Sequence, residues 1–233
     1  MKNNNNFNED NILNKEYELL KLAIPHHDEF QAVVGDILSS IDTVNPKIIE
    51  IGCGTGITTS IIDKAIDADI TSVDIEESMI TRARSKEYRN NVNFTCSDII
   101  NFLKKQEDDS IDVVVSGYTL HNLEARLRQE VCREIYRVLK TKGLFINADK
   151  MALDNKLEYK KVFEEQIAAY DIFRGIGHSD LADQWVKHYH VDNSEDIVLV
   201  EGDYKGCLSE ISFGQVDTVY REKLECVVVA KKI

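Results

Sequence analysis

The sequence of 233 residues lacks a long hydrophobic run and an excess of basic charge. No apolar segment approaches the roughly 18–20 residues that a membrane span needs, and the polar start lacks the apolar core of a signal peptide. The 28 lysines and arginines stand against 41 acidic residues, which gives a net charge of −13. Because phosphate contacts need clustered basic side chains, this balance argues against a strongly basic nucleic-acid-binding protein.

Paired cysteines are also missing. The five cysteines are scattered and form no C-x-x-C motif, so neither a zinc knuckle nor a disulfide framework is indicated. A reducing, cytoplasmic setting is therefore expected. The cysteines are Cys53, Cys96, Cys132, Cys207 and Cys226.

The organisation of the chain indicates a single domain over residues 11–233. Residues 1–10 hold four consecutive asparagines and almost nothing apolar, so a disordered tail is expected there. Apolar residues then recur at threes and fours across residues 11–44, which predicts helices on both sides of Pro25. A second helical stretch over residues 154–192 is expected to form a cap insert over one end of the core.

Between these segments the pattern alternates strand and helix. The clearest helix runs from Leu123 to Leu139, and Asn122 is its expected N-cap. The last two strands are close in sequence and are expected to form an antiparallel hairpin. Strands rich in Ile and Val between amphipathic helices indicate an α/β fold, a mostly parallel, doubly wound sheet covered on both faces. The expected strands are 47–51, 69–73, 92–95, 111–116, 143–147, 215–220 and 224–231.

A glycine-rich loop is the sharpest motif. Glu50-Ile-Gly52-Cys53-Gly54-Thr-Gly56 follows the first strand and opens a helix, a context typical of nucleotide-like ligands. The dinucleotide fingerprint requires a further glycine at position 57, where this chain has isoleucine. Glu50, two residues before the first glycine, would disfavour a pyrophosphate and favour a ligand that carries an ammonium group.

Two more carboxylates follow successive strands. Asp74 ends the second strand, where a ribose-binding carboxylate is expected. Asp98 follows the third strand and could accept a hydrogen bond from an adenine amine, although Asp at such a position is often only a helix cap. Ile75 and Ile99 would pack on the two ring faces. Three carboxylates at strand ends and no P-loop lysine indicate a cationic nucleoside, S-adenosylmethionine.

In order and spacing these motifs resemble the class I S-adenosylmethionine-dependent methyltransferases, over about residues 25–149 and the last two strands. The resemblance implies a Rossmann-like sheet of seven strands with an antiparallel C-terminal strand. It also implies that the three glycines and Cys53 line the methionine side, Asp74 holds the ribose and Asp98 faces the adenine. The segment Val115-Ser116-Gly117-Tyr118 would border the methyl-donor pocket.

Residues 23–30, 118–124 and 169–181 also resemble the carboxy-S-adenosylmethionine synthases that serve tRNA modification. In that family a tyrosine stands where this chain has His27, and a cap arginine grips the additional carboxylate. The nearest basic residue here is Lys187, and the glycine loop keeps the ordinary methyltransferase form. The second resemblance therefore indicates shared architecture rather than a shared reaction.

Candidate catalytic residues follow the fourth strand. His121 lies where α/β sheets bind ligands and could take a proton from a substrate, or it could lie beneath the cofactor or cap the next helix. Tyr118 could be a pocket wall or a hydrogen-bond donor. Asp149-Lys150 could meet substrate or form a solvated pair. No metal is predicted. The candidate ligands in the cap show no i, i+4 pair on one helix face. These candidates are His178, Asp180, Asp183, His188 and His190.

The sequence thus predicts methyl transfer from S-adenosylmethionine to an O, N or C atom of a small molecule. The helices expected over residues 11–44, called the lead-in helices below, and the cap would close the pocket over this acceptor. Two alternatives stay open: a carboxy-S-adenosylmethionine synthase and a non-catalytic S-adenosylmethionine-binding module. A homodimer through the cap is conceivable, and neither a nucleic-acid nor a membrane partner is expected.

Overall fold

The computed structural model describes residues 12–233, so the expected disordered tail at residues 1–10 lies outside the described part of the chain. The strands are β1 (Lys47–Ile51), β2 (Asp69–Asp74), β3 (Val92–Cys96), β4 (Ile111–Gly117), β5 (Leu139–Lys150), β6 (Phe213–Glu222) and β7 (Glu225–Lys232). They form one seven-stranded sheet in the order β3-β2-β1-β4-β5-β7-β6. β1 to β5 pair in parallel, and β7 runs antiparallel to both of its neighbours. The predicted fold class is confirmed.

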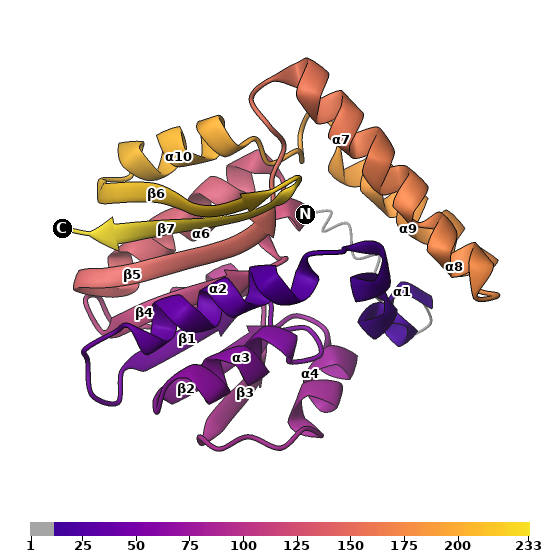
Figure 1. Ribbon diagram of the computed structural model, residues 1–233. Helices are drawn as coiled ribbons and strands as arrows, with labels where there is room; N and C mark the ends of the chain where they lie inside the picture. The colour runs from indigo at the N-terminus through magenta and orange to yellow at the C-terminus, as the bar shows by residue number, and fades with distance from the viewer. Residues whose placement is uncertain (1–11) are drawn as a thin grey trace.

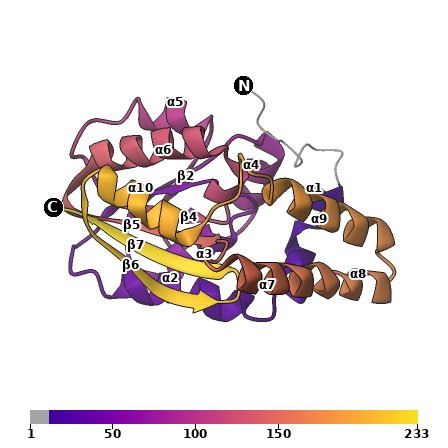
Figure 2. The same ribbon diagram turned by 90° about the horizontal axis from the view of Figure 1, so that it is seen from above.

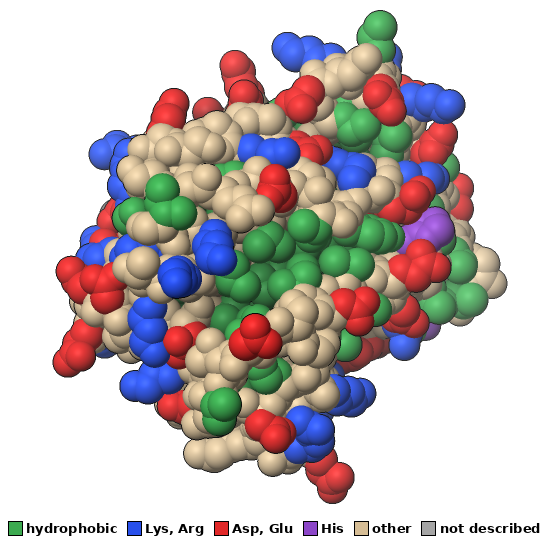
Figure 3. All heavy atoms as spheres, turned by 60° about the vertical axis from the view of Figure 1, so that its left-hand side comes forward, with side chains coloured by type: hydrophobic (Ala, Val, Ile, Leu, Met, Phe, Trp, Pro, Cys, Tyr) green, Lys and Arg blue, Asp and Glu red, His purple; other side chains and the backbone are tan. Residues whose placement is uncertain are grey.

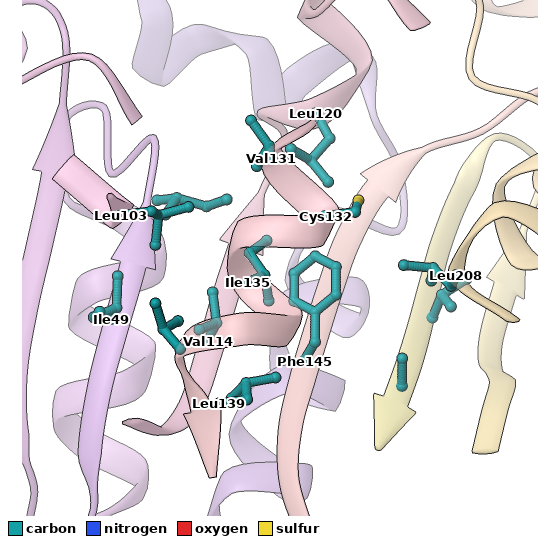
Figure 4. Packing of buried hydrophobic residues seen from close by; sticks show 14 of the residues in the cluster. Ile49, Leu103, Val114, Leu120, Val131, Cys132, Ile135, Leu139, Phe145 and Leu208 are labelled. Carbon is teal, nitrogen blue, oxygen red and sulfur yellow. The ribbon is translucent and has the colours of Figure 1, made fainter. Parts of the chain in front are cut away.

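Helices cover both faces of this sheet, because the side chains of each strand alternate between two buried clusters. Ile48 packs with side chains of α2 (His27–Ser39) and α3 (Ile57–Ala65). Its neighbour Ile49 packs on the other face with side chains of α5, α6 and α10. Figure 2 shows these three helices together on one face of the sheet. Figure 4 shows Val131 and Ile135 of α6 beside Val114 and Phe145 of the sheet. These helices are α5 (Ile99–Leu103), α6 (Ala125–Val138) and α10 (Glu201–Glu210).

Several predicted boundaries differ from the structure. Asn122 does not cap α6: it ends a short 3-10 helix, η2 (Leu120–Asn122), and Glu124 takes the N-cap position. α4 (Glu77–Arg84) packs against β2 and β3. α10 was missed, because its sequence contains two glycines and only Tyr204 and Leu208 are buried. Tertiary packing of these two side chains stabilises a helix that local propensity disfavours.

The predicted cap lies beyond the carboxyl ends of the parallel strands (Figure 1). It consists of α7 (Lys156–Ala169), α8 (Asp171–Gly175) and α9 (Ser179–Asp192). The lead-in elements α1 (Ile12–Lys15) and the 3-10 helix η1 (Tyr17–Ala23) share a hydrophobic cluster with it. The lead-in segment and the cap therefore form one layer over the same edge of the sheet.

On the face that Figure 3 shows, acidic and basic side chains are interspersed around an area of hydrophobic side chains. No extended patch of one sign covers this face. Among the described residues, no helix is long and apolar enough to cross a membrane.

Candidate active site

The glycine loop makes a tight turn directly after β1. The backbone N–H groups of Gly52 and Cys53 both donate to the carbonyl of Val73, at 2.7 and 3.0 Å. All three loop glycines adopt positive φ, at +68° for Gly52, +52° for Gly54 and +83° for Gly56. Side chains of L-residues disfavour this region, so each position favours glycine on conformational grounds alone.

The surroundings of the three glycines differ. A Cβ at Gly52 would lie 2.1 Å from Oγ1 of Thr119, and a Cβ at Gly56 would lie 2.5 Å from Oη of Tyr88. A Cβ at Gly54 would meet nothing within 4 Å. Gly52 and Gly56 are thus required by packing, whereas Gly54 borders open space at which a ligand can approach the backbone.

Glu50 does not face that space. It is fully buried beneath the loop, where its Oε2 accepts hydrogen bonds from Oγ1 of Thr59 and Oγ of Ser72, each at 2.6 Å. Burial raises the pKa of Glu50 to about 7. The sequence predicted ligand contacts for Glu50, Gly56 and Ser116. None of these three residues lines the cavity into which the glycine loop opens. β1 is buried on both sides, so its pattern could not reveal which way Glu50 points.

The other two carboxylates do face the cavity. Asp74 accepts backbone N–H groups from Gly54 at 2.8 Å and from Glu76 at 2.9 Å. Burial raises the pKa of Asp74 in spite of these hydrogen bonds. Asp98 caps α5 by accepting from the N–H of Asn101 at 2.9 Å, so the helix-cap role applies and its second oxygen remains for a ligand.

One cavity connects these groups to the cap. Its loop-side compartment is formed by residues at the ends of β1, β2 and β3: Gly52, Cys53, Gly54, Asp74, Ile75, Asp98 and Ile99. Its cap-side compartment combines aromatic side chains with two charged ones: Tyr118, Lys150, Tyr170, Trp185, Tyr189 and Glu225. His27 and His121 line the same cavity. Sequence-distant predicted residues are thus brought to a single site.

Tyr118 belongs to the cap-side compartment and lies next to His27 and His121. It adopts a positive φ of +48°, which costs energy for a residue with a side chain. Its ring stacks on His27, with centroids 6.1 Å apart and planes inclined by 3°. It also lies edge-on to His121 at 6.4 Å. This position fits the predicted role of Tyr118 as a pocket wall.

His121 is held by a buried carboxylate. Its Nδ1 lies 2.5 Å from Oδ1 of Asp149, and its backbone N–H donates to Oδ2 of the same residue at 3.2 Å. Asp149 is completely buried, so it is not part of a solvated pair. An ionised carboxylate accepts the Nδ1 proton, which leaves Nε2 as the basic atom of the ring. Such a pair can hold and release one proton in the cavity.

A second buried carboxylate lies on the other side of this imidazole. Oδ2 of Asp192 is 3.9 Å from Nε2 of His121 and 3.3 Å from Nε2 of His188. Nζ of Lys150 bonds to the same oxygen and lies 3.9 Å from the centroid of the Tyr189 ring. Burial alone would raise the pKa of Asp192, but the ammonium group of Lys150 lowers it overall. Burial lowers the pKa of His188 to about 3, so this imidazole is neutral.

This arrangement could in principle hold a cation. The ligand atoms of His121, His188 and Asp192 all lie within 4.8 Å of one another. In this structure the ammonium group of Lys150 supplies the positive charge beside the carboxylate. Among the cap residues considered for a metal from sequence, only His188 lines the cavity, and its partner one turn later is Asp192.

Comparisons with known proteins agree with this geometry. Residues 49–147 match the model of a methyltransferase domain family. The chain is 30% identical over 160 residues to a carboxy-S-adenosyl-L-methionine synthase of Campylobacter fetus subsp. fetus (strain 82-40), covering 67% of this chain and 65% of that relative. The chain carries a class I S-adenosylmethionine-dependent methyltransferase domain. All residues that form the loop-side compartment lie within the matched segment.

The methyltransferase domain is also similar to a second curated protein and, in fold, to a solved structure. It is 35% identical over 109 residues to a malonyl-(acyl-carrier protein) O-methyltransferase of Bacillus cereus, over 45% of this chain and 38% of that protein. A magnesium protoporphyrin IX methyltransferase from Synechocystis PCC 6803, solved with bound S-adenosylmethionine, superposes with a TM-score of 0.57 at 14% identity. That match covers 90% of this chain and 81% of the other, and it concerns the fold alone.

Some residues in and around the cavity were missed or misplaced in the sequence analysis. Lys187, expected nearest the position of a cap arginine, is exposed and does not line the cavity; the basic residue there is Lys150. Asp192 and Glu225 carry no local motif. The available signals were that Asp192 follows His188 by one helical turn and that Glu225 begins the terminal strand.

Proposed function

We propose that the protein transfers a methyl group from S-adenosylmethionine to an O, N or C atom of a small molecule. The observation that carries this proposal is one cavity that joins the loop-side compartment to the His121–Asp149 pair. The cap and the 3-10 helix η1 cover this cavity, which favours a small acceptor over a polymer.

The loop-side compartment fits the cofactor. Gly54 leaves the space that a Cβ would occupy, and Asp74 retains acceptor capacity for ribose hydroxyl groups beyond its two backbone hydrogen bonds. The free oxygen of Asp98 would accept the adenine amine, between the apolar side chains of Ile75 and Ile99. Cys53 and His27 would border the methionine end. When bound, S-adenosylmethionine supplies a methyl group attached to a positively charged sulfur.

The chain's own residues then align the acceptor and take its proton. An in-line displacement depends mainly on holding the nucleophile close to the methyl group in a site without bulk water. Nε2 of His121 accepts the acceptor proton as the new bond forms, and Asp149 stabilises the resulting imidazolium. Tyr118, edge-on to His121, keeps the acceptor against the imidazole.

The test is an acceptor screen that measures S-adenosylhomocysteine release with panels of small phenols, amines and carbon acids. In His121→Asn, turnover of the best acceptor should fall by about 10²–10⁴ while S-adenosylhomocysteine affinity stays within about twofold. His190→Asn, an exposed histidine on α9, is the matched control and should leave turnover unchanged. An acceptor turned over equally fast by His121→Asn would contradict the proposed role of His121, and a screen without product would contradict methyl transfer.

A carboxy-S-adenosylmethionine synthase is the second candidate, supported by the similarity to the Campylobacter fetus enzyme. The structure gives it less support, because Lys187 is exposed and the ammonium of Lys150 is already paired with Asp192. Mass spectrometry of the ligand that copurifies with the protein separates the two candidates. S-Adenosylmethionine or S-adenosylhomocysteine supports the first, and a carboxylated sulfonium supports the second.

We propose further that the protein works in a reducing compartment such as the cytoplasm, since all five cysteines are free and three are buried. The net charge of −13 supports a small-molecule acceptor rather than a nucleic acid. A homodimer through the cap remains the proposed assembly, to be tested by sedimentation.

A further inference from the structure

Glu225 is a buried carboxyl group that the proposed methyl transfer does not use. It begins β7, pairs across the sheet with Lys150 of β5 and is 4% exposed. The hydroxyl group of Tyr118 interacts with this carboxyl group, whose Oε1 is buried, and the side chain lines the cavity. Burial raises the pKa of Glu225 to about 7. A carboxyl group has several lone pairs, so Glu225 can accept a hydrogen bond from a ligand donor in addition to the one from Tyr118.

The walls around Glu225 are aromatic. Tyr118, Tyr170, Trp185 and Tyr189 all line the cap-side compartment with it. The rings of Tyr170 and Trp185 stack at 6.1 Å with an interplanar angle of 18°, and Tyr189 meets Tyr170 edge-on at 5.5 Å. Aromatic side chains that line a cavity favour a flat ring packed against them through stacked and edge-to-face contacts.

The positive charge in this compartment is already paired. The ammonium of Lys150 already lies over the Tyr189 ring and is bonded to Asp192. A charged acceptor would have to lose its hydration in this buried site. A neutral donor, such as a hydroxyl or a ring N–H, meets no such penalty.

We propose that the cap-side compartment binds a planar aromatic acceptor whose hydroxyl or N–H group donates a hydrogen bond to Oε1 of Glu225. This inference rests on the proposed function, because it names the class of acceptor for the same site. Glu225 is then a specificity-determining residue: it orients the ring, and the methyl transfer itself takes place at His121.

The experiment uses three probes of similar size with the full chain saturated by S-adenosylhomocysteine: phenol, toluene and cyclohexanol. Toluene replaces the hydroxyl of phenol by a methyl group and is more hydrophobic, so an apolar pocket without an acceptor binds it more tightly. We expect phenol to bind about fivefold more tightly than toluene, the ratio that one net hydrogen bond supplies. Phenol should also exceed cyclohexanol by about the same factor, because cyclohexanol keeps the donor and lacks the flat ring.

Two variants assign the preference to Glu225. Glu225→Gln keeps an oxygen acceptor and should retain the preference for phenol, whereas Glu225→Leu should reverse it in favour of toluene. Glu164→Leu, on the exposed surface of α7, is the matched control and should behave as the parent. S-Adenosylhomocysteine affinity, measured in each variant, reports that the protein is folded.

The outcomes separate this inference from the proposed function. If the parent does not bind S-adenosylhomocysteine, the proposed function fails. If it binds S-adenosylhomocysteine but phenol binds no more tightly than toluene, or not at all, the inference is wrong and the proposed function stands. A phenol preference that persists in Glu225→Leu also overturns it, and cyclohexanol binding as tightly as phenol removes the aromatic ring from the proposal.

Discussion

The three glycines of the loop after β1 look alike in sequence and differ in what surrounds them. Gly56 packs against Tyr88, Gly52 packs against Thr119, and Gly54 borders open space. Motif reasoning assigned all three to the ligand. The distinction depends on residues 30 to 70 positions away along the chain, and no local pattern encodes it.

This difference predicts opposite phenotypes for one substitution. Gly54→Ala should weaken S-adenosylhomocysteine binding about tenfold or more while lowering stability by about 1 kcal/mol, the strain of a positive φ. Gly56→Ala should lower stability by about 1–3 kcal/mol, since its Cβ also meets Tyr88 and Ala83. Its remaining folded fraction should bind the ligand nearly as the parent does. Titration calorimetry measures the affinity of each variant for S-adenosylhomocysteine, and urea unfolding measures its stability. If Gly54→Ala bound the ligand as tightly as the parent, no ligand would approach the backbone at Gly54.

Glu50 predicts a pH dependence of stability. Burial holds its pKa near 7 in the folded protein, above the ordinary value of 4.5. The folded state therefore keeps a proton that the unfolded chain releases, so this contribution is full below pH 4.5 and is lost as the pH rises through about 7. Glu50→Gln should reduce the fall in stability between pH 4.5 and 8 by about 3 kcal/mol.

Urea unfolding across that pH range measures the difference between Glu50→Gln and the parent. Glu50→Gln retains an oxygen for the hydroxyl groups of Thr59 and Ser72. Parallel stability curves for the two proteins would contradict a raised pKa for Glu50.

At the scale of elements, the cap depends on a hydrophobic cluster of its own. Phe173 of α8 is fully buried there, together with Tyr170, Trp185 and Leu20 of the lead-in segment. Gly177, at φ +87°, separates α8 from α9. Periodicity predicted the existence of these helices. It could not predict which of their side chains face the cavity, because that depends on contacts with the sheet and with η1.

The cap cluster gives an element-scale prediction. Phe173→Ala should destabilise the protein by about 3–5 kcal/mol, the usual cost of removing a buried aromatic ring. Ile172→Ala is the matched control. Ile172 precedes Phe173 in the chain and its side chain is 41% exposed, so its removal should destabilise the protein far less. Fluorescence of Trp185, the only tryptophan, reports unfolding of this same cluster. Equal stabilities of the two variants would show that the cap does not depend on Phe173.

For the whole molecule, the order of motifs was enough to predict the sheet, its antiparallel terminal strand and the loop-side compartment. The cap-side compartment was less accessible to sequence reasoning. Lys150, Asp192 and Glu225 come from three distant segments, and only the fold brings their charges together. A lone buried carboxylate has no sequence signature, because burial is a property of the complete tertiary structure.

The central claim is that the loop-side compartment binds S-adenosylmethionine through Asp74. Titration calorimetry with S-adenosylmethionine and S-adenosylhomocysteine tests it most directly, on the parent, on Asp74→Ala and on Asp69→Ala. Asp69 begins the same strand, is exposed and lies at its opposite end, so it controls for the loss of a charge. We predict micromolar binding by the parent and Asp69→Ala, and no measurable binding by Asp74→Ala. Absence of binding by the parent, or undiminished binding by Asp74→Ala, would contradict the account.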